Sequence, residues 1–281
     1  MRPHGYLPIF YFRKNITLLA LLAVILLLAL LHFPALAAPA REQVLEDLPY
    51  QADIWILRDA ARARVSLKRL GRGRYRAQVA AEAWGLAKLL SGRRRDTYST
   101  EMVLRRGRLV PLVYREECRR WGKYSLKEYR FNYKRRRLEL WQHHAGKGLR
   151  RKWRTSLKGK PIYDPLSAFY NFRLGALGRP RPGETLRVRG IPYPQPEEIA
   201  IKIGDKTPEG RKVMVSLANR AVNDEPVVIF IFFNEKWTPL KGWARILSFG
   251  KAVGKMLPGG KPWNCALPER LAGRKAKAPG P

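Results

Sequence analysis

The chain has 281 residues and carries 56 Lys and Arg against 22 Asp and Glu, a formal net charge of +34. Hydrophobic residues make up 46% of it, which is enough for a folded core and argues against a wholly disordered chain. Its two cysteines, Cys118 and Cys265, exclude a disulfide-rich scaffold and a zinc site built from several cysteines. A partner of net positive charge is also disfavoured.

A basic and then apolar segment opens the chain. Basic residues up to Lys14 precede an uncharged run from Ile16 to Leu31, and the small-residue site Ala35-Leu36-Ala37 follows. This order is typical of a secretory signal peptide cleaved after Ala37, or three residues later, so residues 1–37 would be removed. Alternatively, residues 16–38 form an uncleaved anchor in the inner membrane, because about 20 apolar residues cross a bilayer. Both interpretations predict an exported, periplasmic protein.

The following residues alternate in polarity over short segments, with basic or Gly-containing breaks between them. This pattern is typical of strands joined in hairpins. Residues 38–257 are therefore predicted to form a single all-β domain, an antiparallel curled sheet that is an open barrel or a sandwich. Residues 84–90 are compatible with one or two helical turns. The expected strands are 52–57, 64–70, 75–83, 96–104, 109–117, 123–133, 138–142, 186–189, 198–203, 212–218, 226–233 and 243–249.

Three turns of this predicted sheet are strongly basic. They lie near residues 71, 107 and 135, and alternate turns of consecutive hairpins lie at the same end of a sheet. The pattern predicts a positive rim, although charges also gather at turns simply because turns are solvated. The residues expected to bind anions are Arg105, Arg106, Arg108, Arg135, Arg136 and Arg137.

A short helix is predicted over residues 164–174. Asp164 can cap it, Pro165 suits its first position, and Gly175 would end it. Leu166, Phe169, Tyr170 and Arg173 would share one face. From residue 258 to residue 281 Gly, Pro, Lys and Arg dominate, so this segment is predicted to be a flexible basic tail.

The helical segment Asp164-x-Leu166-Ser167-x-x-Tyr170-x-x-Arg173 resembles a motif of an exported bacterial family, the domain of unknown function 3108. Other features agree in order: residues 109–114 resemble the l-x-P-x-x-Y strand of that family, residues 183–186 its Gly-led return strand, and residues 228–239 its apolar strand and Pro-containing turn. The resemblance covers roughly residues 50–256. It implies an antiparallel, β-rich periplasmic protein of a single domain, and no established activity.

The sequence offers little for catalysis. Ser167 has no histidine tied to it that would activate a nucleophile, and Asp164 is more simply the helix cap. Arg173 is expected to have a structural role, either paired with Asp164 or covering an apolar surface. His143 and His144 are adjacent and point apart on a strand, so we expect a solvated loop pair with no metal and no cofactor. A disulfide between Cys118 and Cys265 is compatible with an oxidising periplasm, as are two free thiols.

These features favour a binding or structural module for anionic envelope components, namely lipid headgroups, lipopolysaccharide phosphates or an acidic polysaccharide. An envelope hydrolase acting on sugar or peptide polymers is an alternative that would need either converging carboxylates or a base near a nucleophile. Nucleic-acid binding is a second alternative, since tyrosines and tryptophans alternate with Arg and Lys, but the leader argues against it. No feature of the sequence specifies an oligomeric state.

Overall fold

The structure is a computed structural model that describes residues 42–144, 147–178, 180–191, 198–217, 227–246 and 250–263. The predicted leader and the hydrophobic helix expected within it lie outside the described residues, as does Cys265. Every described strand and both cores belong to one compact unit, Glu42–Pro281. No helix among the described ranges is long and apolar enough to cross a membrane.

The described residues of this unit form fifteen strands and two helices, and the sequence places a turn residue at most of their boundaries. In chain order they are β1 (Gln43–Ile54), β2 (Leu57–Gly71), β3 (Arg74–Ala83), α2 (Gly85–Leu90), β4 (Arg95–Arg105), β5 (Arg108–Arg120), β6 (Lys123–Asn132), β7 (Arg137–His144), β8 (Gly148–Ser156), β9 (Ile162–Tyr163), α3 (Pro165–Arg173), β10 (Thr185–Gly190), β11 (Glu198–Thr207), β12 (Gly210–Leu217), β13 (Val227–Phe233), β14 (Pro239–Ile246) and β15 (Gly250–Met256).

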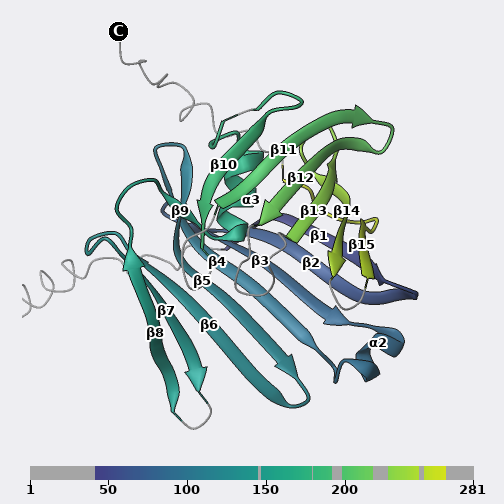
Figure 1. Ribbon diagram of the computed structural model, residues 1–281, viewed down its shortest axis with the longest axis horizontal. Coiled ribbons are helices and arrows are strands. Elements are labelled where there is room, and N and C mark those ends of the chain that lie inside the picture. The colour runs from purple at the N-terminus through teal and green to yellow at the C-terminus, as the bar shows by residue number, and fades with distance from the viewer. Residues whose placement is uncertain are drawn as a thin grey trace, which may run out of the picture. The chain divides into compact units, whose positions relative to one another are not determined.

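All fifteen strands belong to one sheet, which curls around α3 (Figure 1). Strands β1 to β8 follow one another as antiparallel hairpins, and β10 to β15 do the same. The two halves join where β15 pairs with β1, for example at Tyr50 and Met256. The outermost strands, β8 and β9, do not pair with each other, so the sheet is open. The predicted curled, β-dominated fold is confirmed, with one difference: the short pair β9 and β10 is parallel.

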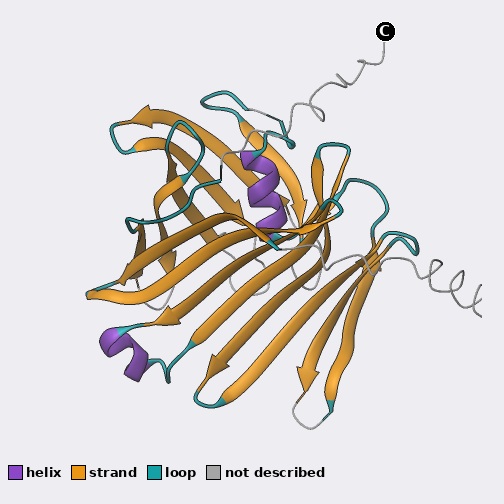
Figure 2. Ribbon diagram, turned by 180° about the vertical axis from the view of Figure 1, so that it is seen from behind, coloured by secondary structure: helices purple, strands orange, loops and turns teal. Residues whose placement is uncertain are grey.

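Side chains alternate between an inner face that packs against α3 and an outer face in solvent. The register places Tyr114 beside Tyr129 and Tyr129 beside Leu140, and all three are buried in the first core cluster. A second cluster lies under β11 to β13 and includes Ile201 and Phe233. Helix α3 lies within the curl of the sheet (Figure 2). It contributes side chains to both clusters, with Tyr170 in the first and Phe172 in the second.

The predicted helix is confirmed at α3. Asp164 has an extended backbone and its carboxylate accepts hydrogen bonds from the backbone N–H groups of Leu166 and Ser167, both at 3.0 Å, while Pro165 occupies the first turn. These bonds satisfy two of the free donors at the helix start. The one or two helical turns expected over residues 84–90 are also present, as helix α2.

The beginning of the predicted tail is placed against the sheet. The backbone of Lys261 exchanges two hydrogen bonds of 2.8 Å with Asp47 of β1. Trp263 packs against the first core cluster and its backbone N–H donates to Glu46. The indole ring of Trp263 explains this docking, because burying its apolar surface is favourable, whereas the basic residues around it have little apolar surface to bury. Residues 264–281 lie outside the described part of the chain.

Candidate anion-binding rim and the buried helix motif

The hairpin order brings the three basic turns to one end of the sheet. The turns join β2 to β3, β4 to β5 and β6 to β7, and in a run of antiparallel hairpins alternate turns share an end. Neighbouring turns of this set are two strand spacings apart, about 10 Å. In two of them an arginine and a glycine form the loop, with positive φ at Arg72 and Gly73 and at Arg106 and Gly107. Such backbone suits a tight hairpin.

The six arginines predicted to bind anions sit on two of these turns and are all exposed. We call them the basic rim: Arg105, Arg106, Arg108, Arg135, Arg136 and Arg137. Within the described residues, none of the six forms an ion pair. Their charges are therefore left for solvent or for an external anion.

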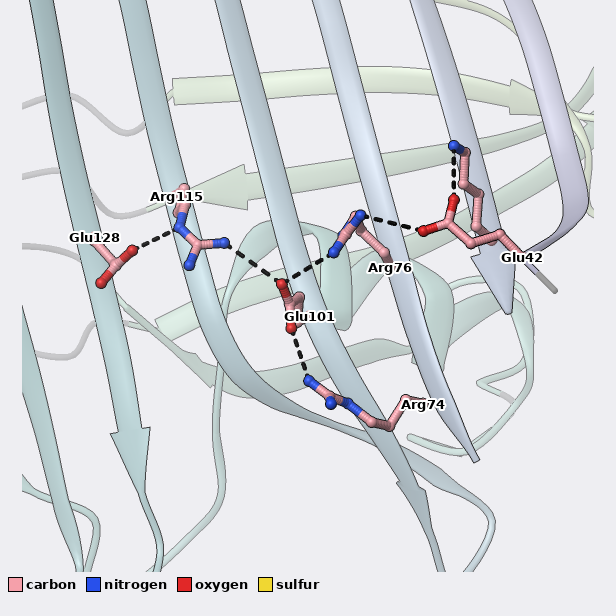
Figure 3. A network of polar contacts seen from close by, with 7 residues as sticks. Glu42, Arg74, Arg76, Glu101, Arg115 and Glu128 are labelled. Carbon is pink, nitrogen blue, oxygen red and sulfur yellow. Dashed lines mark hydrogen bonds and ion pairs between the residues drawn. The ribbon is translucent and has the colours of Figure 1, made fainter. Parts of the chain in front are cut away.

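Most acidic residues of the neighbouring outer face are already engaged. A ladder of carboxylates and guanidinium groups crosses β1 to β6, and Glu101 lies at its centre (Figure 3). Arg74 donates to Glu101 at 3.0 Å, and Arg115 reaches from Glu101 to Glu128. Glu42, Arg76 and Arg130 extend the ladder at its two ends. Because strand residues take up these acids, the rim arginines have no acidic partner in the part of the chain that the structure describes.

Glu128 shows how strongly the ladder holds its acids. Burial acts to raise the pKa of Glu128, but hydrogen bonds from Arg130 at 2.5 Å and Arg115 at 2.6 Å outweigh it, so the pKa lies below its ordinary value of 4.5. The carboxylate is therefore held in its ionised form. This carboxylate is a structural partner of arginines and is not a free acid of the kind that a hydrolase would use.

The helix motif is buried inside the curl, away from the rim. Asp164 is fully buried and, besides capping α3, accepts a hydrogen bond from Thr100 of β4 at 3.0 Å. Burial raises the pKa of Asp164, and the hydrogen bonds from Ser167, Thr100 and Leu166 work against that rise. The Ser167 hydroxyl donates to the Asp164 backbone carbonyl at 3.1 Å, so it closes the first helical turn. Leu166 contributes to the first core cluster.

The other end of α3 is tied to β1 through a buried charge pair. Arg173 donates two parallel hydrogen bonds of 2.7 Å to the carboxylate of Glu46, and Tyr170 donates to the same carboxylate at 2.8 Å. Arg173 also donates to the backbone carbonyl of Trp237 at 2.8 Å. The structural role expected for Arg173 is found, but with Glu46 as partner. A pair with Asp164 is wrong, because Asp164 caps the opposite end of the helix.

Glu46 is the member of this network that sequence reasoning missed. It lies on β1 two residues before Leu48 and four before Tyr50, so the three side chains share one face of the strand, and that of Glu46 points inward. The sequence signal for a buried ion pair was an acid at an inward position of a strand, because a buried carboxylate needs a cationic partner. Its partner is 127 residues away in the chain, so no local spacing indicates it.

The histidine pair and Cys118, the remaining candidate residues, do not form a common site among the described residues. His143 and His144 end β7 and do not form a loop, and His143 packs edge-on against Tyr124. No group of three metal-ligating side chains occurs among the described residues. Cys118 lies partly buried on β5, and its possible disulfide partner, Cys265, is outside the described part of the chain.

The chain matches one family model and is similar to a solved structure, and both are described as domains or proteins of unknown function. A family model described as a protein of unknown function, DUF3108, matches residues 49–204. Among solved structures, the chain is similar to a beta-barrel-like protein of the domain of unknown function DUF1849 from Brucella abortus, with 10% sequence identity and a TM-score of 0.48. That similarity covers 76% of this chain and 96% of the other. No curated protein matches the chain.

Proposed function

The chain belongs to the DUF3108 family of proteins of unknown function, and we propose that it is an exported cell-envelope protein whose basic rim binds anionic envelope components. One observation carries this proposal: six exposed arginines from two neighbouring turns have no acidic partner among the described residues. The chemistry they fit is that of phosphate or carboxylate groups, whether on a lipid headgroup, a lipopolysaccharide or an acidic polysaccharide.

Arginine suits this role because its planar guanidinium donates two parallel hydrogen bonds to one phosphate or carboxylate. The β4–β5 and β6–β7 turns lie about 10 Å apart, so each turn can engage a separate anionic group. A polymer or surface that repeats its charges would therefore bind more tightly than a single ion, because the second contact becomes intramolecular.

The binding free energy that the basic rim can contribute is limited. A basic residue near an anionic surface contributes about 1 kcal/mol, and the attraction falls off within a screening length of about 10 Å at 0.1 M salt. Six arginines therefore support useful binding at low salt and weak binding at high salt. The leader, interpreted as a signal peptide or an inner-membrane anchor, supports a periplasmic location where such anions are present.

Inorganic polyphosphate tests the proposal, because it offers repeated phosphates and no apolar part. The chain from Ala38 contains the whole compact unit with both cores and is the form to use. We expect R105Q/R106Q/R108Q and R135Q/R136Q/R137Q each to weaken polyphosphate binding about ten- to a hundredfold, with a smaller dependence on salt, because each removes three contacts of about 0.5–1 kcal/mol.

The matched control removes the same charge elsewhere. R150Q/K152Q/R154Q neutralises three exposed cations of the edge strand β8 that form no ion pair among the described residues. We expect it to retain most of the binding. Equal losses in the control and in the rim variants would show that net charge alone attracts the polymer, and the rim would then have no special role.

A further inference from the structure

The end of the sheet opposite the basic rim is apolar. Every large hydrophobic side chain of the described residues that is more than half exposed lies at this end, and each is 59–70% exposed. These six residues come from the β1–β2 turn, from α2 between β3 and β4, and from the β5–β6 turn (Figure 1). We call them the apolar edge: Trp55, Ile56, Leu86, Leu89, Leu90 and Trp121.

The apolar edge is held in place by backbone hydrogen bonds between its connections. The N–H of Trp55 donates to the carbonyl of Lys251, and the N–H of Trp121 donates to the carbonyl of Gly92, at 2.8 and 2.9 Å. The N–H of Trp84, just before α2, donates to the carbonyl of Ala60 at 2.8 Å. Exposed apolar groups are costly in water, so a fixed cluster of them indicates a contact surface.

Cations surround these apolar side chains. A hollow of about 290 Å³ lies between α2 and the β5–β6 turn, with Leu89 and Trp121 on its apolar side and Arg93, Arg119 and Arg120 on its charged side. The three arginines are exposed and form no ion pair within the described ranges. Among the acids close to them in sequence, Asp96 pairs with Arg94 and Glu116 pairs with Lys127, while Glu117 accepts a hydrogen bond from the Tyr124 hydroxyl.

We propose that the apolar edge docks onto an anionic phospholipid bilayer, with the hollow taking a lipid phosphate. Tryptophan rings favour the headgroup region of a bilayer, leucines favour the acyl region beneath it, and arginines pair with lipid phosphates. The three kinds of side chain are present here at the tips of rigid connections. This site is independent of the basic rim and goes beyond the proposed function, since the two sites lie at opposite ends of the strands.

Charge decides between the bilayer and other occupants. A second copy of the chain would bring Arg93, Arg119 and Arg120 against the same cations of its partner, which is unfavourable. The apolar side chains stand on turns and on a short helix, so the surface that they offer is a set of projections and suits a soft bilayer. An anionic bilayer satisfies both the apolar and the cationic groups.

Cosedimentation with vesicles tests this inference, with the chain from Ala38 and with vesicles of phosphatidylglycerol and phosphatidylcholine or of phosphatidylcholine alone. In about 1 M salt the screening length is about 3 Å, so binding that persists reports apolar insertion. We expect L86S/L89S/L90S to lower this salt-resistant binding about tenfold or more. Helix α2 contains no buried residue, so the substitutions leave the core intact.

Two further variants assign the contacts. R93Q/R119Q/R120Q should lower binding to phosphatidylglycerol vesicles at low salt about tenfold and reduce the preference over phosphatidylcholine, whereas R105Q/R106Q/R108Q of the basic rim should leave salt-resistant binding unchanged. Salt-resistant binding that is equal in the wild type and L86S/L89S/L90S would overturn the inference. The inference would also be overturned if L86S/L89S/L90S lost self-association in sedimentation velocity but still bound vesicles as the wild type does. If the basic rim did not bind anions, its variants would bind polyphosphate as well as the wild type does, and salt-resistant vesicle binding would be unaffected.

Discussion

Arg173 and Glu46 meet through two hydrogen bonds of 2.7 Å, and neither side chain has any exposed surface. The pair fastens the last turn of α3 to β1, the strand at which the two halves of the sheet join. Tyr170 and the backbone of Trp263 complete the carboxylate's partners. The motif that first suggested the family therefore acts by fixing the helix inside the sheet, and the surfaces proposed for binding lie elsewhere.

Removing one partner of this pair is expected to be costly. R173M leaves the Glu46 carboxylate buried without its cation, and we expect the free energy of unfolding to fall by about 3–5 kcal/mol in urea denaturation. E46Q/R173M removes both charges and should recover part of that loss. If the double variant were less stable than R173M by the full effect of E46Q alone, the two residues would not be coupled.

The carboxylate ladder predicts acid sensitivity through Glu128. Its pKa is depressed in the folded protein, so the unfolded state binds more protons as the pH falls. The stabilisation is complete above the unfolded value of about 4.5 and is lost as the pH drops through the lower folded pKa. Urea denaturation between pH 6 and acid conditions should show a weaker dependence on pH in E128Q than in the wild type.

Glu235 provides the control for this measurement. Its pKa is also lowered by a hydrogen bond from Lys206, but both side chains are largely exposed, at 72% and 67%. Solvent screens such a pair, so E235Q should follow the wild-type profile closely. A larger change in E235Q than in E128Q would contradict the importance assigned to the buried ladder.

Arg106 occupies a backbone conformation that disfavours its side chain. Its φ is 49°, in the left-handed region that asparagine and glycine tolerate better. We expect R106N to raise the free energy of unfolding by about 0.5–1 kcal/mol while it weakens polyphosphate binding. R105N removes a rim charge from the last residue of β4, where φ is not positive, and should weaken binding without that gain.

Gly92 is expected to be necessary for the position of Trp121. A Cβ atom at residue 92 would lie 2.2 Å from the indole ring, and the φ of Gly92 is +68°. Gly122 has a similar φ of +70° but open space around it, so G122A isolates the backbone strain of about 1 kcal/mol. G92A should lose about 1–3 kcal/mol more than G122A in urea denaturation and should also weaken salt-resistant vesicle binding. Equal losses would mean that the ring moves aside without cost.

Much of the fold and of the basic rim follows from local sequence. Alternation sets the faces of a strand, and Arg-Gly at residues 72–73 and 106–107 sets two hairpins. Once consecutive hairpins are assigned, their alternate turns must share an end, so the sequence places the two rim turns at the same end. Asp164 followed by Pro165 likewise specifies the start of α3.

The hairpin order also predicts which turns form the apolar edge. The other set of alternate turns contains Trp55 and Trp121, and α2 connects β3 to β4 at that end. The sequence alone did not reveal it, because leucines at residues 86, 89 and 90 are equally consistent with a helix that buries them. Only the packing of α2 against β2 leaves those side chains in solvent.

By itself, then, the sequence determined the β-rich class, the hairpin order and the start of the helix, because each depends on residues close together in the chain. The tertiary structure decided that β15 pairs with β1, that Arg173 pairs with Glu46 and that Trp263 docks on the first core cluster. These contacts join segments that lie far apart in the chain, and no local pattern specifies which buried charge or which strand pairs with which partner.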